Sequence, residues 1–163
     1  MLAPIVSLMG PTASGKSELA ASLAAALNGE LISVDSALIY KGFNIGAAKP
    51  CHPHHLINFR DPVSPYSAAE FAKDAKLTIS DIRSRSKLPI LVGGSMLYFR
   101  TLIFGMSEMP GTNLEIRSKI EREAKKKGWS ALYAELCKID PATATRVHPN
   151  NRQRISRALE VFR

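Results

Sequence analysis

Residues 10–17 read Gly-Pro-Thr-Ala-Ser-Gly-Lys-Ser and fill every fixed position of the phosphate-binding pattern G-x-x-x-x-G-K-[ST]. An apolar run, 5–9, precedes this loop and a helical segment, 18–27, follows it, which is the strand, loop and helix order that the motif requires. The glycines let successive N–H groups point at an anion, while Lys16 adds a positive charge and Ser17 a hydroxyl ligand for Mg²⁺. The candidate phosphate-binding residues are Gly10, Pro11, Thr12, Ala13, Ser14, Gly15, Lys16 and Ser17.

The first part of the chain repeats the order of strand, loop and helix. Apolar runs at 30–34 and 88–92 predict two further buried strands. Ser67 and Glu70 form a capping box that predicts a helix toward residue 86. Such a repeat favours an α/β fold of the P-loop NTPase type, with a parallel sheet flanked by helices.

Two other segments complete this half. Residues 41–66 are predicted to be mostly loop, with a short strand-like stretch at 56–59. Gly93-Gly94-Ser95 turns the third strand into a predicted helix over 96–104, and Ser95 is either the N-cap of that helix or a ligand contact.

The second part of the chain is predicted to be helical. Helices are expected over 114–127, over 130–139, after Asp140-Pro141 and from residue 152 onward. The expected domains are a P-loop α/β core (1–110), an all-helical insertion or appendage (111–149) and a helix that returns to the core (150–163). Because the last helix ends without a cap, we expect the native chain to continue.

Composition limits location and metal chemistry. The 163 residues contain no apolar run near the roughly 18 to 20 residues that span a bilayer, and residues 1–4 carry no basic signal-peptide region. We therefore expect a cytoplasmic protein with no membrane segment. Cys51 lies among His52, His54 and His55, but the prolines around it favour a surface loop over a metal site.

The formal net charge is +8, and the basic surplus lies in residues 81–163. Such a surface would attract a polyanion such as RNA in a salt-dependent way. The alternative is a solvated helix face, and charge alone leaves the two interpretations open. Arg152, Arg154 and Arg157 cluster on the last predicted helix and are either solvated or a phosphate-contacting stripe.

Asp35 directly follows the second predicted strand, at the end of the strand where ligands bind in α/β sheets. Three roles are open: a Mg²⁺ ligand, a general base for an incoming nucleophile, or a cap of the following turn. Its position beside the phosphate loop makes the cap the weakest of these interpretations.

Several blocks of sequence occur together in an order that resembles the bacterial tRNA dimethylallyltransferases, or tRNA isopentenyltransferase family. They cover essentially the whole chain and are the stretches 10–17, 32–40, 45–50, 54–57, 91–99 and 148–155. The resemblance implies transfer of a dimethylallyl group from dimethylallyl diphosphate to N6 of the adenosine 3′ of the anticodon.

The resemblance also implies roles for residues. Thr12 to Ser17 would hold the diphosphate with the help of Mg²⁺, and Asp35 would accept the proton from the adenine N6. Arg117 could also steady the leaving diphosphate. The partners would be dimethylallyl diphosphate and a tRNA anticodon stem-loop, bound by a monomer. The implied tRNA-contacting residues are Asp35, Ser36, Ala37, Leu38, Ser95, Arg117, Gln153, Arg154, Ile155, Ser156 and Arg157.

The chain departs from the family pattern in several places. Ser95 and Ala47 stand where the family usually has threonine, and the stretch 50–54 is shorter than is typical. Family members are also substantially longer, so we expect a C-terminal truncation. The alternatives are a P-loop small-molecule kinase and a nucleotide- or RNA-binding fragment without catalysis. Transfer of the prenyl group to a free nucleotide is a further alternative, although the basic helical half argues for tRNA.

Overall fold

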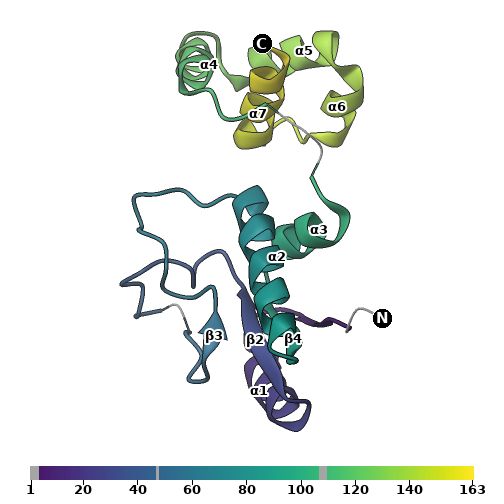
Figure 1. The fold of residues 1–163 in the computed structure, drawn as a ribbon. Helices are drawn as coiled ribbons and strands as arrows, with labels where there is room; N and C mark the ends of the chain where they lie inside the picture. The colour runs from purple at the N-terminus through teal and green to yellow at the C-terminus, as the bar shows by residue number, and fades with distance from the viewer. Residues whose placement is uncertain (1–3, 47, 107–109) are drawn as a thin grey trace. The chain divides into compact units, whose positions relative to one another are not determined.

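The computed structural model describes residues 4–46, 48–106 and 110–163 (Figure 1). Its contacts divide the chain into two compact units, residues 1–106 and 107–163. Ala47, the second position where the family usually has threonine, lies outside the described residues.

Unit 1 contains a parallel sheet flanked by helices, which confirms the predicted fold class. Its strands are β1 (Val6–Met9), β2 (Gly29–Val34), β3 (His54–His55) and β4 (Leu88–Gly93). Within the described residues they pair in the order β1-β4-β2-β3. The described residues of 41–66 are mostly loop, as predicted, but the strand-like stretch at 56–59 forms no strand, because Leu56 and Asn58 take positive φ angles of 62° and 57°. The described pairing of this segment consists of β3 and one isolated bridge from Arg60 to Tyr40. A left-handed residue breaks the extended geometry that a strand needs.

The two faces of the sheet pack against different helices. On one face α1 (Lys16–Ala26) covers Leu31, Ile90 and Val92, and on the other α2 (Ala68–Ser84) and α3 (Met96–Phe104) cover Ile32, Val34 and Leu91. This alternation is the two-residue period of side chains along a strand. The capping box predicted from Ser67 and Glu70 begins α2.

The register of the sheet aligns three strand ends. Gly93 at the end of β4 lies opposite Met9 of β1 and opposite Val34 of β2. The segments that follow these residues therefore leave the sheet at the same edge. A Cβ atom at Gly93 would lie 2.0 Å from the carbonyl oxygen of Val34, so this close approach requires glycine.

Unit 2, in its described residues, is built of helices, as the sequence predicted. They are α4 (Leu114–Lys127), α5 (Trp129–Ile139), α6 (Pro141–Arg146) and α7 (Arg152–Phe162). Their shared apolar core includes Ile120, Leu132, Leu136, Ile155 and Leu159. Within this unit α7 packs against α4 and α5. The expected domain bounds, with a helix over 150–163 returning to the α/β core, stay a prediction.

None of the helices in the described ranges combines the length and apolar composition needed to cross a bilayer.

Candidate functional site

The phosphate-binding loop joins β1 to α1. Gly15 takes a left-handed conformation with φ 76° at the N-cap of α1. Because glycine has no side chain to cap the helix, the first N–H groups of α1 remain available to an anion. The ammonium of Lys16 donates to the carbonyl of Pro11 and lies 3.2 Å from Oγ of Ser14. The loop thus holds a positive charge beside a row of potential N–H donors.

A cavity of about 490 Å³ opens beside this loop. It is lined by the loop residues from Thr12 to Ser17 and also by Asp35, Ala37 and Leu38 from the segment after β2. The structure therefore brings six of the eight predicted phosphate-binding residues, all but Gly10 and Pro11, and the predicted base to one cavity. This convergence follows from the aligned strand ends described above.

The carboxylate of Asp35 is held by the turn that follows it. Its Oδ1 accepts hydrogen bonds from the N–H groups of Ala37, at 2.8 Å, and Leu38, at 3.2 Å. The turn-cap role, which the sequence made the weakest interpretation, is therefore present. Among the described hydrogen bonds the turn occupies Oδ1 and does not use Oδ2, so the same carboxylate can cap the turn and accept a proton.

Ser95 lies at the N-cap position of α3, but its hydroxyl is used elsewhere. Its Oγ accepts a hydrogen bond of 3.0 Å from the N–H of Ser36, and α3 has no side-chain cap bond from it. The N–H of Ser95 in turn donates to the carbonyl of Val34 at 3.2 Å. The expected N-cap position of Ser95 is thus confirmed, but its side chain does not cap the helix and instead connects β4 to the segment that carries Asp35.

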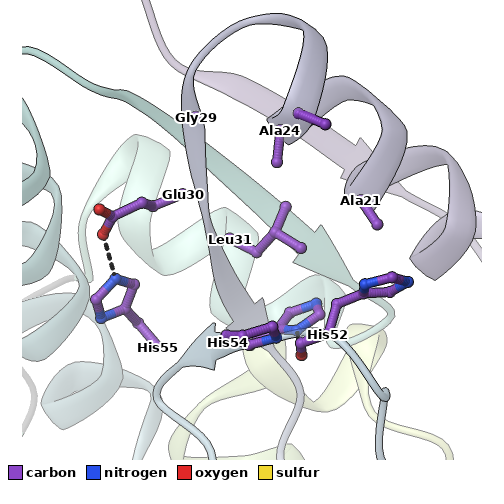
Figure 2. A pocket seen from close by; sticks show the side chains of 10 residues that line it. Ala21, Ala24, Gly29, Glu30, Leu31, His52, His54 and His55 are labelled. Atoms are coloured by element: carbon purple, nitrogen blue, oxygen red, sulfur yellow. Dashed lines mark hydrogen bonds and ion pairs between the residues drawn. The ribbon is translucent and has the colours of Figure 1, made fainter.

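His54 is a cavity residue that the sequence analysis weighed as a metal ligand and placed in the family block 54–57 without a role of its own. It lines the phosphate-loop cavity and also a second cavity of about 480 Å³ on α1 and β2 (Figure 2). Burial lowers the pKa of its imidazole. Its Nδ1 lies 2.7 Å from the carbonyl of His52, which requires the proton on Nδ1 of the neutral ring. The sequence draws attention to His54 through its neighbouring histidines, but only the fold shows that it lines the phosphate-loop cavity.

The neighbouring histidines do not gather around a common point. Figure 2 shows His55 turned toward Glu30, with 2.7 Å between Nε2 and Oε2. Among the residues that the structure describes, no three His, Cys, Asp or Glu side chains form a metal-binding group.

The acidic partner of two predicted tRNA contacts in unit 2 was missed by the sequence analysis. Glu160 on α7 has a side chain that is only 1% exposed, and its Oε2 lies 3.0 Å from Nε of Arg117 and 3.0 Å from Nη1 of Arg157. Its Oε1 accepts a 2.7 Å hydrogen bond from the N–H of Asn113. Arg157 also donates to the carbonyl of Pro110 at 2.6 Å.

Two opposing effects act on this carboxyl. Burial alone would raise the pKa of Glu160, but the bonds from Arg157, Asn113 and Arg117 outweigh it and hold the pKa below its usual value. The group is therefore charged and neutralised by internal partners. The only sequence signal was the i,i+3 spacing of Arg157 and Glu160, which is common on exposed helix faces.

The other predicted contacts on α7 differ in accessibility. Arg152, Gln153 and Arg154 are exposed, whereas Ile155 is fully buried in the core of unit 2 and Ser156 is half-buried. Ile155 thus contributes to the position of α7, and a direct contact from its side chain would require that core to open. The accessible candidates for RNA contact in this helix are the three residues at its start.

The sequence model of the IPP transferase family matches residues 38–163. The chain belongs to the IPP transferase family. Two curated relatives named tRNA dimethylallyltransferase, from Halorhodospira halophila and a Polaromonas species, are each 54% identical to it. They match 100% and 99% of this chain but only 54% and 50% of their own lengths. The chain spans about half the length of the curated relatives it matches.

Solved structures of this family show the same fold. A full-length tRNA isopentenylpyrophosphate transferase from Bacillus halodurans matches with a TM-score of 0.62 and 40% identity, over 97% of this chain and 55% of that protein. A eukaryotic dimethylallyltransferase acting on tRNA matches with a TM-score of 0.78 and 32% identity, over 97% of this chain and 41% of that protein. The predicted P-loop NTPase-like α/β fold is thereby confirmed.

Proposed function

We propose that this IPP transferase chain carries the phosphate-binding and proton-accepting part of a tRNA dimethylallyltransferase. The reaction would move a dimethylallyl group from its diphosphate to N6 of the adenosine 3′ of the anticodon. The observation that carries the proposal is the single cavity lined by both the phosphate-binding loop and Asp35. The names of the relatives and the similarity to a eukaryotic dimethylallyltransferase acting on tRNA support it.

In the proposed reaction the lone pair of N6 attacks the allylic carbon, and the bond from that carbon to the diphosphate oxygen breaks. Negative charge grows on the departing diphosphate, where Lys16 and the N–H groups at the start of α1 would stabilise it. Asp35 would take the proton that N6 loses. The product is a secondary amine on the adenine, and the leaving group is inorganic diphosphate.

The site also suits Mg²⁺. The hydroxyl of Ser17 lines the cavity next to Lys16, and Mg²⁺ prefers hard oxygen ligands shared with phosphate groups. Ser17 together with diphosphate oxygens would hold the ion, which when bound supplies further neutralisation of the leaving group.

We further propose that the tRNA is held partly by unit 2, whose exposed basic side chains suit an anticodon stem-loop. Single-stranded RNA loops present phosphates and splayed bases, which match a surface such as Arg152, Gln153 and Arg154. Because Arg117 and Arg157 are bound to Glu160, we assign them to the support of this surface as well as to contact.

The test is a transfer assay with radiolabelled dimethylallyl diphosphate, Mg²⁺ and an anticodon stem-loop. A parallel arm offers γ-labelled ATP with small acceptors, which tests the kinase alternative. We expect label on the stem-loop and none on the acceptors. Label from ATP on an acceptor would replace the proposal with a kinase, and binding of both substrates without transfer would leave a non-catalytic fragment.

The variant Asp35→Asn tests the role of the base. Because a positioned base contributes about 10²-fold or more to the chemical step, single-turnover transfer should fall by at least that factor while stem-loop affinity stays the same. The matched control is Asp61→Asn, since Oδ1 of Asp61 also accepts a turn N–H, that of Val63 at 3.0 Å, outside the cavity. Transfer within tenfold of the unaltered chain would exclude Asp35 as the base.

A further inference from the structure

Asp35 lies between two peptide groups that bind the same residue. The carbonyl of Val34, just before it, accepts the N–H of Ser95 at 3.2 Å. The N–H of Ser36, just after it, donates to Oγ of Ser95 at 3.0 Å. One residue, two positions beyond the end of β4, thus holds both chain neighbours of the proposed base.

Other contacts make this connection rigid. Gly93, two residues before Ser95, lies so close to Val34 that a Cβ atom would meet its carbonyl at 2.0 Å. The strand pairing of β2 with β4 extends as far as Val34 and Gly93. Ser95 therefore continues the sheet pairing for one step beyond the last strand residues, using a side chain in place of a backbone acceptor.

The carboxylate itself is fixed by the same segment. Since Oδ1 accepts from Ala37 and Leu38, the rotation of the side chain is set by the turn that Ser36 begins. In the hydrogen bonds that the structure describes, Oδ2 has no donor of this kind, so it is the oxygen left to accept a proton. Moving Ser36 would move the donors that hold Oδ1 and would turn Oδ2 away.

We propose that Ser95 is a positioning residue, which orients Oδ2 of Asp35 by holding the peptide groups on both sides of it. This role rests on the proposed function and differs from a tRNA contact, which the family resemblance implies for this position. It also accounts for a serine where the family usually has threonine, because both provide the hydroxyl acceptor.

The first measurement follows the Ser36 amide and needs no activity. Hydrogen exchange is compared in the unaltered chain, Ser95→Ala and Ser95→Thr. Loss of one hydrogen bond should speed exchange of the Ser36 amide roughly tenfold in Ser95→Ala, and Ser95→Thr should restore the slow rate. The control is Ser84→Ala, which removes a hydroxyl bound to the Asp81 carbonyl at 2.7 Å on α2. Equal exchange in the unaltered chain and Ser95→Ala would overturn the proposal.

The second measurement is the transfer assay with the same variants. A small misplacement of a reacting group costs up to about 10²-fold, so we expect kcat to fall roughly tenfold to hundredfold in Ser95→Ala with KM for the stem-loop unchanged. Ser95→Thr and Ser84→Ala should keep kcat within about threefold. A raised KM with normal kcat would make Ser95 a tRNA contact and overturn the positioning role, as would normal values of both.

The two measurements test the positioning role and the proposed function independently. If the unaltered chain transfers no prenyl group, the proposed function fails for this chain, and the exchange of Ser36 alone decides whether Ser95 holds the segment around Asp35.

Discussion

The buried carboxylate of Glu160 makes unit 2 sensitive to a single substitution. In Glu160→Ala the N–H of Asn113 loses its acceptor, and Arg117 and Arg157 lose their shared partner. Removing one member of a buried ion pair typically costs about 3 to 5 kcal/mol. Because the two arginine side chains are 43% and 33% exposed, water can replace part of the lost interaction. We therefore expect a loss of about 2 to 3 kcal/mol in the free energy of unfolding of unit 2.

The single tryptophan gives this unit its own signal. Trp129 begins α5 and packs against the core of unit 2, so its fluorescence during urea unfolding reports on this unit. The control is Glu121→Ala, at an exposed position of α4, which should change the free energy by less than about 0.5 kcal/mol. Glu160→Gln should lose less than the alanine variant, since its amide oxygen can still accept from Asn113. A cooperative transition in Glu160→Ala with a loss below about 1 kcal/mol would refute this account of the carboxylate.

Two other predictions concern charge. Replacing Arg152 and Arg154 by glutamine should flatten the slope of log affinity for an anticodon stem-loop against log salt, measured by fluorescence anisotropy, by about 0.7 to 0.9 per residue. The control Lys73→Gln on α2 should leave this slope unchanged. A slope that the arginine substitutions do not change would place the RNA surface elsewhere. The side chains of Arg85 and Lys87 hold the pKa of Glu30 well below its usual value, so the stabilisation it provides is present above about pH 4.5 and is lost as the pH falls through the lowered value. Urea midpoints followed by circular dichroism should thus fall less steeply with acid in Glu30→Gln, and parallel curves would contradict this coupling.

The sequence predicted the elements whose signals are local. The phosphate-binding loop, the apolar runs of β2 and β4 and the capping box of α2 each depend on residues close together in the chain. The strand β3 was not predicted, because it has only two residues and its pairing depends on β2, which no local period reveals.

The site was predicted less completely for a similar reason. The hydrogen bond from Ser36 to Ser95 joins residues 59 positions apart, so the sequence, which offered a helix N-cap or a ligand contact for the serine, could not show it. Glu160 was missed because a glutamate three residues after an arginine is typical of an exposed helix face, and only the packing of α7 on α4 buries it.

The aligned strand ends also constrain when the site can exist during synthesis. The phosphate-binding loop emerges from the ribosome early, but Gly93 and Gly94, which lie against Gly10, and Ser95 follow much later in the chain. Because β4 pairs with both β1 and β2, in the described sheet β1 has no partner strand and β2 has only the two-residue β3 until residues 88–93 have left the exit tunnel. A nascent chain that ends before β4 therefore exposes the phosphate-binding loop without the central strand beside it, and the cavity, which Val92, Gly93 and Gly94 help to line, forms late in biosynthesis.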